Sequence, residues 1–371
     1  MKYKIEVATS IRGFLNNLFG HEFANIEFIN RQHSSEITGL NKVLLRKIFE
    51  SKLLDLIGFI QVHKKTTSND ALITYNRFLS TDKPYYIICE NPTALFHYRL
   101  GRNKGLLARR QIPAHLCDEN LKGIVCISQA CSTTFSRIHG VDCGKVYQIY
   151  PMIPDVNAAK GANTQDKITC LFVSSTFELK SGCEIVEVAS KLPNVNFVLI
   201  TRHSNIPEET KRKISSLKNI KLVEFSLSKE ELAEYYLKSD ILLHPTRQDS
   251  FALVVLEAMK FGLPVISTNV YAIPEMVQDG VNGYLTEPRY HFFDHYNMPN
   301  PAIWNHRKDT IYSKYIDENI IKFLLDKILL LDSNRELLKT MSDNSIKIAQ
   351  DKFGEHRIKE QWQNLITETL G

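Results

Sequence analysis

Long apolar runs are missing from this sequence of 371 residues. No stretch reaches the roughly 18 consecutive apolar residues that a membrane-spanning helix requires. Residues 1–10 are charged and strand-like, without the pattern of a signal peptide. We therefore expect a protein that is not exported and is located in the cytoplasm, with peripheral contact at the inner face of the cytoplasmic membrane as an additional hypothesis.

Paired cysteines and acidic metal motifs are missing as well. The seven cysteines are odd in number and form no Cys-x-x-Cys pair, which favours buried thiols in a reducing compartment over disulfides. No Asp-x-Asp pair occurs, and no group of His, Cys and Asp has the spacing of metal ligands. We expect neither a bound metal nor another cofactor.

Zinc-finger spacing, RNP-type aromatic motifs and basic heptads are also lacking, so nucleic acid is not an expected partner. The formal charge is +5, but it is unevenly distributed. Residues 1–165 carry 21 Lys and Arg against 13 Asp and Glu, or +8, whereas the remaining residues carry 25 against 28, or −3. A basic half of this kind suits an anionic substrate or an anionic membrane surface.

From residue 167 onward, apolar runs of strand length alternate with segments of helical period. This alternation is typical of a parallel sheet covered by helices on both faces. The expected strands are 168–173, 196–200, 221–225, 240–244, 264–267 and 283–285. The expected helices between them are 183–191, 207–217, 229–238 and 252–261.

The N-terminal half is also predicted to be α/β, with strands expected at 3–8, 71–75, 85–89, 124–127 and 146–149. Pro151 and Pro154, followed by polar residues without periodicity, indicate a linker between two domains. Beyond an irregular stretch at 289–315, helices are expected at 318–331, 334–349 and 355–370.

The segment at 244–259 combines the end of a strand, a loop and a helix start with two carboxylates. Asp249 precedes the helix, and Glu257 lies about 7 Å along it from the first turn. The carboxylates suit the hydroxyl groups at the two ends of an elongated ligand. First-turn amides lack intrahelical partners and suit a diphosphate. The candidate amides are those of Ser250, Phe251, Ala252 and Leu253.

The block at 244–285 resembles retaining glycosyltransferase family 4. The resemblance is carried by Glu257-Ala258-Met259, Gly262-Leu263-Pro264-Val265-Ile266, Pro274-Glu275, Asp279-Gly280 and Asn282-Gly283-Tyr284-Leu285. The family has an E-x7-E motif, and the matching positions here are Asp249 and Glu257, so the first acid is one methylene shorter. The resemblance implies that Asp249 attends the donor sugar and Glu257 the ribose hydroxyls.

The resemblance also implies the GT-B fold, in which two Rossmann-like α/β domains face each other across a donor and acceptor cleft. We expect an acceptor-side domain at 1–153 and a nucleotide-sugar-binding domain at 154–350. A C-terminal helix at 351–371 is expected to pack back on the first domain.

Further donor-site candidates follow from the same resemblance. Lys180 stands where the family has a lysine that neutralises the donor diphosphate, but the accompanying arginine is replaced by Ser174-Ser175. Arg202, after the next strand, is a candidate replacement. The loop that contains Phe225 and Ser226 corresponds to the segment that holds the nucleotide base.

The acceptor side departs further from the family pattern. The first loop keeps a single glycine, Gly13, and Glu90 stands at the position of a histidine close to the reacting sugar. Glu90 is either a hydrogen-bonding group or base at the acceptor or an ordinary structural acid. His97 is a further acceptor-side candidate. Ser128 is expected to cap the following helix.

An enzyme of this family would transfer a hexosyl unit with retention from a UDP- or GDP-sugar, without a metal. The acceptor would be a glycan or a lipid-linked saccharide in surface polysaccharide or glycoconjugate biosynthesis. Two alternatives stay open: a catalytically degenerate GT-B subunit that acts as a non-catalytic partner, and a sugar-nucleotide epimerase. A dinucleotide-binding enzyme is disfavoured because no Gly-x-Gly-x-x-Gly follows any expected strand.

A basic amphipathic segment at 41–60 contains Lys42, Arg46, Lys47 and Lys52, and a second basic cluster lies at 99–110. We expect the apolar face of this segment to pack on the core of the protein. Its basic face is a candidate contact with an anionic bilayer.

Overall fold

The computed structural model describes residues 2–10, 12–29, 51–140, 144–156 and 167–371. The chain divides into two compact units. Unit 1 comprises Met1–Pro154, His295–Pro299 and Glu355–Gly371, and unit 2 comprises Asp155–Asp294 and Asn300–Gly354. Among the described residues, no helix is both long enough and apolar enough to span a membrane.

Unit 1 contains a parallel six-stranded sheet in the order β2-β1-β4-β6-β7-β8. These strands are β1 (Tyr3–Val7), β2 (Ile26–Ile29), β4 (Ala71–Tyr75), β6 (Tyr85–Cys89), β7 (Leu121–Cys126) and β8 (Val146–Gln148). β3 (Val62–Lys64) and β5 (Phe78–Ser80) pair separately. The helical elements are α1 (Leu15–Phe19), α3 (Lys52–Ile57), η1 (Pro92–Phe96), η2 (Arg102–Lys104), α4 (Ala108–Leu116), α5 (Gln129–His139) and α13 (Glu355–Leu370).

Unit 2 contains a second parallel sheet, in the order β11-β10-β9-β12-β13-β14. Its strands are β9 (Thr169–Ser174), β10 (Asn196–Thr201), β11 (Ile220–Glu224), β12 (Ile241–His244), β13 (Val265–Thr268) and β14 (Gly283–Thr286). Its α-helices are α6 (Gly182–Lys191), α7 (Glu208–Ser216), α8 (Lys229–Lys238), α9 (Leu253–Lys260), α10 (Pro301–Trp304), α11 (Glu318–Ser333) and α12 (Arg335–Phe353), with short turns η3 (Glu178–Lys180), η4 (His203–Asn205) and η5 (Ile273–Glu275).

The strand order of unit 2 reverses between β9 and β12. The chain runs outward from β9 through β10 to β11 and then returns to β12 on the other side of β9. In open parallel sheets, ligands bind outside the carboxyl ends of the strands at such a switch point. The loops that follow β9 and β12 are therefore the expected place for a ligand, and they contain Lys180 and Asp249.

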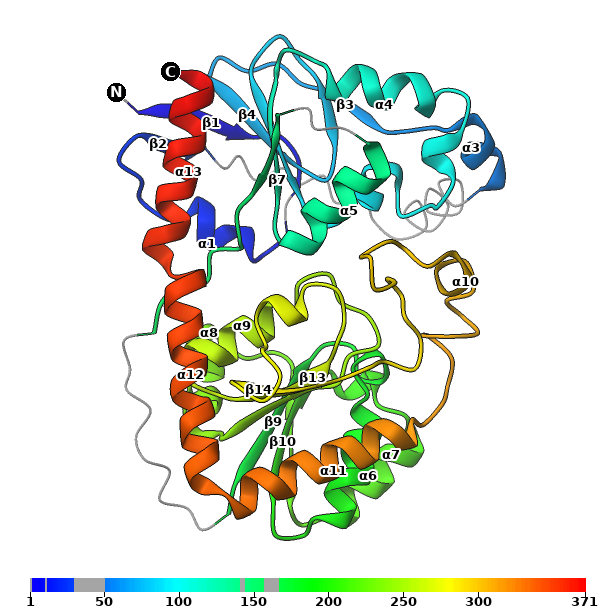
Figure 1. Ribbon diagram of the computed structural model, residues 1–371, viewed down its shortest axis with the longest axis vertical. Coiled ribbons are helices and arrows are strands. Elements are labelled where there is room, and N and C mark those ends of the chain that lie inside the picture. The colour runs from blue at the N-terminus through cyan, green and yellow to red at the C-terminus, as the bar shows by residue number, and fades with distance from the viewer. Residues whose placement is uncertain (1, 11, 30–50, 141–143, 157–166) are drawn as a thin grey trace. The chain divides into compact units, whose positions relative to one another are not determined.

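The C-terminal helix α13 belongs to unit 1, as the sequence predicts, and crosses its first strands (Figure 1). The Trp362 ring meets Phe28 of β2 edge to face at 6.2 Å. The Asn25 side-chain amide donates to Thr367 over 2.6 Å, and His21 pairs with Glu355 over 2.8 Å. Packing and polar contacts together fix the helix on unit 1.

Most expected strands are confirmed to within a residue or two, whereas β7 begins three residues earlier than expected. The sequence pattern does not predict β2, β3 or β5, which have only three or four residues each. The predicted cap at Ser128 is confirmed. Ser128 accepts from the amide of Cys131, and Ser228 and Glu231 form a capping box at α8.

The expected core packing of the segment at 41–60 is confirmed for Ile60, which belongs to the core of unit 1, and is wrong for α3. Residues 41–50 lie outside the described residues, and α3 has no buried residue. Leu53 and Leu56 are 65% and 70% exposed. Helix α3 is short because Gly58 follows it with φ 76° and ends it in a left-handed cap.

The close approach of β13 to β14 can be tested by substitution of a glycine. A Cβ added to Gly283 would lie 2.0 Å from the carbonyl oxygen of Val265, whereas one added to Gly13 would meet nothing within 4 Å. We expect Gly283→Ala to lower the free energy of unfolding by about 3 kcal/mol through overpacking, with Gly13→Ala as the matched control. Equal urea midpoints for the two variants would contradict the register of these strands.

Candidate functional site

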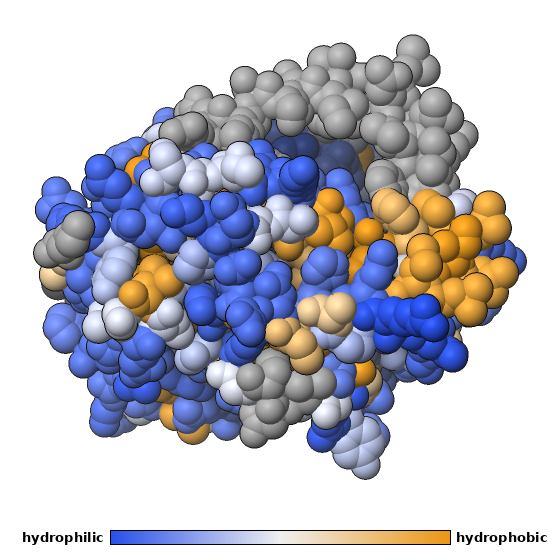
Figure 2. Space-filling view, turned by 90° about the horizontal axis from the view of Figure 1, so that it is seen from above, coloured by the Kyte–Doolittle hydropathy of each residue, from blue (hydrophilic) through white to orange (hydrophobic). Residues whose placement is uncertain are grey.

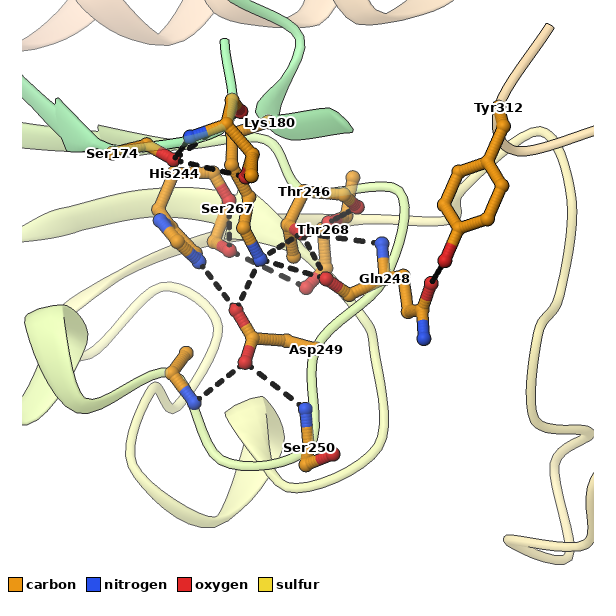
Figure 3. Close-up of polar contacts among 12 residues, drawn as sticks. Ser174, Lys180, His244, Thr246, Gln248, Asp249, Ser250, Ser267, Thr268 and Tyr312 are labelled. Carbon is orange, nitrogen blue, oxygen red and sulfur yellow. Dashed lines mark hydrogen bonds and ion pairs between the residues drawn. The ribbon is translucent and has the colours of Figure 1, made fainter. Parts of the chain in front are cut away.

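Asp249 lies at the centre of a polar network in the loop that follows β12 (Figure 3). Its Oδ2 accepts from Nζ of Lys180 at 2.6 Å and from Nε2 of His244 at 3.0 Å. Its Oδ1 accepts from the backbone amides of Ser250 and Ala252, both at 3.0 Å. The carboxylate thus accepts four hydrogen bonds, and its side chain is 18% exposed.

This environment favours the charged form of Asp249. Burial alone would raise the pKa of its carboxyl, but the charge of Lys180 and the hydrogen bond from His244 hold the pKa far below its usual range. Burial also lowers the pKa of His244. The neutral ring therefore carries its proton on Nε2, which donates to the carboxylate.

Lys180 connects the loop after β9 to the loop after β12. Besides Asp249, its ammonium donates to the hydroxyl of Thr246 at 2.9 Å and to the carbonyl of Gln248 at 2.7 Å. The side chain is 12% exposed. All three acceptors lie in one loop, so the lysine fixes the conformation of that loop directly before α9.

The start of α9 differs from the expectation. Ala252 has a φ of 64° and precedes the helix, which begins at Leu253 rather than Ala252. Two of the four expected phosphate donors, the amides of Ser250 and Ala252, are bonded to Asp249 instead. The side chain of Phe251 is buried. The first turn of α9 itself presents the amides of Leu253 and Val254 to an anion, and the sequence pattern does not indicate the second.

Glu257 lies one turn farther along α9. The hydroxyl of Tyr236 in α8 donates to its Oε2 at 2.9 Å, and the charge of Lys229 acts on the same carboxylate. Among the described residues, Oε1 accepts no hydrogen bond. Burial raises the pKa of this carboxyl. Glu257 therefore keeps an oxygen that can accept a hydrogen bond from a ligand, in contrast to Asp249.

The remaining donor-site candidates lie at the carboxyl ends of neighbouring strands. Arg202 follows β10 and is exposed, and its guanidinium forms no hydrogen bond or ion pair with a described residue. Phe225 follows β11 with 39% of its surface exposed, and Ser226 beside it is exposed. Ser174, at the end of β9, bonds to Thr176 in its own loop. A cation and an aromatic ring are thus accessible at this edge of the sheet.

The irregular stretch at 289–315 is tied to the same loop by contacts that the sequence does not reveal. Buried Arg247 donates to Glu184 of α6 at 2.9 Å and lies 3.8 Å from the centre of the Tyr315 ring. Tyr312 donates to the side chain of Gln248 at 3.1 Å (Figure 3). Residues 311–314, Arg247 and the loops after β9 and β10 line a pocket of about 670 Å³.

Glu90, at the end of β6 in unit 1, is also surrounded by donors. Tyr75 donates to its Oε2, Tyr98 donates to Oε1 at 2.5 Å, and Arg12 lies 3.4 Å from Oε1. The residue is 5% exposed. Glu90 accepts from two phenol groups and pairs with one guanidinium. One of these three groups has to move before the carboxylate can act as a base toward an acceptor.

The two other acceptor-side candidates differ in their surroundings. His97 is half-buried, has a φ of 62° and directly precedes Tyr98. Burial and the nearby Arg77 lower the pKa of His97 to about 4, so the ring is neutral at physiological pH. Gly13 lies in an exposed turn before α1, with open space at its Cα.

The described cysteines are free thiols, and all but two of them are buried: Cys183 is partly buried, and Cys117 is exposed, contrary to the expectation. Cys143 lies outside the described residues. The fold brings Cys89, Cys126 and Cys131 within 4.8 Å of one another, although their sequence spacing does not suggest it. Cys131 donates to the carbonyl of Cys89 at 3.3 Å.

The segment that contains the Asp249 network matches a known protein family. Residues 155–291 match the family model of glycosyl transferases group 1. A crystal structure of Anabaena Alr3699/HepE with UDP and glucose superposes with a TM-score of 0.62 at 14% identity, covering 99% of this chain and 100% of that one. The chain has the GT-B fold.

Two curated relatives match parts of the chain. An uncharacterized glycosyltransferase of Haemophilus influenzae is 26% identical over 204 residues, which cover 53% of this chain and 48% of that protein. A D-inositol 3-phosphate glycosyltransferase of Mycolicibacterium smegmatis is 29% identical over 166 residues, which cover 40% and 38%. The chain thus spans about half or less of the length of these relatives.

The hydrogen bonds of Asp249 predict that the free energy of unfolding depends on pH. Because its folded-state pKa is depressed, Asp249 contributes stability above its unfolded pKa of about 3.9, and this contribution is lost as the pH falls toward the folded value. We expect Asp249→Asn to lower the free energy of unfolding by about 3 kcal/mol at pH 7. The difference from the unsubstituted protein should shrink between about pH 5 and pH 2.

Urea unfolding across this pH range measures the effect. Asp343→Asn is the control, because Asp343 forms an exposed pair with Lys339 on α12, and such pairs contribute less than about 1 kcal/mol. A difference for Asp249→Asn that stays constant with pH would contradict the charged, four-bonded carboxylate.

Proposed function

We propose that this protein is a retaining glycosyltransferase of family 4 that transfers a hexosyl unit from a UDP- or GDP-sugar to a glycan or lipid-linked saccharide. The proposed process is surface polysaccharide or glycoconjugate biosynthesis. The observation that carries the proposal is the ion pair of Lys180 and Asp249 directly before α9. It lies in the segment that matches the group 1 family and at the switch point of a GT-B sheet.

In this proposal Lys180 exchanges one anion for another when the donor binds. Its single carboxylate partner carries one negative charge, whereas a nucleoside diphosphate presents more charge and several acceptor oxygens. The amides of Leu253 and Val254, at the positive end of α9, face the same anion. The guanidinium of Arg202, which has no partner among the described residues, lies on the loop after the neighbouring strand and is proposed to take part.

Glu257 binds the ribose in this proposal. It lies four residues beyond Leu253, about 6 Å along the helix, and its Oε1 is available to accept from a hydroxyl while Tyr236 fixes Oε2. The exposed ring of Phe225 then packs against the base, with Ser226 beside it. The nucleotide thus extends from the start of α9 toward the end of β11.

In the proposed chemistry, the bond between the anomeric carbon and the diphosphate breaks, and the acceptor oxygen bonds to that carbon on the same face of the sugar. The proton of the acceptor hydroxyl passes to the departing diphosphate. Lys180 and the α9 amides stabilise the negative charge that develops on the leaving diphosphate, so the proposed mechanism needs no metal. Asp249, released by Lys180, accepts from a sugar hydroxyl and does not attack the anomeric carbon. In unit 1, Glu90, His97 and the loop at Gly13 are the proposed acceptor-side groups.

A non-catalytic GT-B subunit is the second candidate function. The four hydrogen bonds to Asp249 favour it, because a carboxylate with no remaining acceptor capacity stabilises the loop and cannot hold a sugar hydroxyl. The replacement of the diphosphate arginine by Ser174 points in the same direction. Activity measurements separate the two candidates.

Donor binding and turnover provide the test. We expect Glu257→Gln to weaken UDP or GDP binding about tenfold, the cost of one hydrogen bond to a charged group. Asp249→Asn should retain nucleotide binding and lower transfer about 100-fold. Calorimetry measures the first effect, and NMR of the products, with and without EDTA, measures the second and the anomeric configuration.

The outcomes distinguish the candidates. Nucleotide binding without hydrolysis or transfer for any UDP- or GDP-sugar would support the non-catalytic subunit. Full activity of Asp249→Asn would contradict the role of this carboxylate, and inversion at the anomeric carbon would contradict the retaining mechanism.

A further inference from the structure

Unit 1 exposes four leucines on neighbouring elements. Leu53 and Leu56 belong to α3, and Leu106 and Leu107 lie between η2 and α4. They are 65%, 70%, 75% and 46% exposed. Figure 2 shows an apolar patch on the side of the molecule where Figure 1 places α3. We call these four residues the leucine cluster.

The backbone holds the two halves of the leucine cluster together. The amide of Leu106 donates to the carbonyl of Leu56 at 3.3 Å, and that of Leu107 donates to the carbonyl of Ile57 at 2.8 Å. Gly58 and Gly105 permit this approach, because a Cβ on Gly105 would lie 2.4 Å from the Cα of Gly58. The leucines are thus presented by a close-packed pair of segments.

A buried ionic contact supports the same pair of segments. Asp55 of α3 accepts from Nε of Arg99 at 3.0 Å and from Nε of Arg102 at 2.8 Å. The side chain of Arg102 is fully buried. Asp55 is the only acid in α3, and its charge is balanced inside the protein.

Cations surround the leucine cluster. Lys52 directly precedes Leu53, and Lys104 lies two residues before Leu106. Arg109 and Arg110 come shortly after Leu107, and all four of these cations are exposed. The sequence has no Asp or Glu from residue 91 to residue 117. Among the described residues of α3 and 99–110, the surface therefore combines exposed leucines with exposed cations, and the one acid, Asp55, is paired with Arg99 and Arg102.

We propose that the leucine cluster and its four cations bind an anionic lipid bilayer. The leucines enter the boundary between headgroups and acyl chains, and the cations contact lipid phosphates. Apolar burial and electrostatic attraction therefore both contribute to binding. Nucleic acid would match the charge but leave the leucines in water. The proposal rests on surface features of unit 1 and does not depend on the proposed transferase activity.

The test uses the full chain and vesicles of phosphatidylcholine with about 30 mol% phosphatidylglycerol. We expect flotation with these vesicles and little with phosphatidylcholine alone. Arg109→Glu/Arg110→Glu should reduce the partition coefficient by about fivefold or more per charge. Leu56→Gln/Leu106→Gln should reduce it to a similar extent, with unchanged thermal stability because both side chains are exposed.

A matched control replaces exposed leucines elsewhere. Leu329→Gln/Leu330→Gln changes α11 of unit 2, where the side chains are 48% and 38% exposed, and should leave vesicle binding unchanged. As a direct readout, the fluorescence of Leu106→Trp should shift to the blue with anionic vesicles. Absence of binding, binding that survives both double substitutions, or a dimer that dissociates on Leu56→Gln/Leu106→Gln would each overturn the proposal.

Discussion

The ion pair of Lys180 and Asp249 organises the carboxyl edge of the sheet in unit 2. It joins the loops after β9 and β12, the two strands at which the strand order reverses. The same carboxylate bonds the amides of Ser250 and Ala252, which sets the entry of the chain into α9. Glu257 and the first-turn amides of that helix therefore depend on these two amide bonds of Asp249 for their positions.

The ion pair also explains why Asp249 occurs at a position where the resembling family has glutamate. A carboxylate that is one methylene shorter stays close to its own backbone, where it accepts from the amides one and three residues ahead. The sequence pattern locates Asp249 and Glu257 correctly on the strand, loop and helix. It does not indicate that one acid is fully bonded and the other is not, because Lys180 lies 69 residues before Asp249 and Tyr236 lies 21 residues before Glu257.

Local patterns predicted the strands of both six-stranded sheets except β2, since apolar runs such as those of β9, β10 and β12 identify buried parallel strands. These patterns failed where the structure depends on backbone conformation or on contacts between residues that are far apart in the sequence. The positive φ of Ala252 has no sequence signature, because alanine rarely adopts it. The amphipathic pattern of α3 is the same for a helix that packs on a core and for one that exposes its leucines. The contacts of Arg247 with 313–315 join segments about 66 residues apart.

A crystal structure of the protein with UDP tests the central claim most directly. The account predicts the diphosphate at the start of α9, with Nζ of Lys180 moved from Asp249 to a phosphate oxygen and the ribose hydroxyls bonded to Glu257. A diphosphate bound elsewhere, or at α9 with the pair of Lys180 and Asp249 intact, would contradict it.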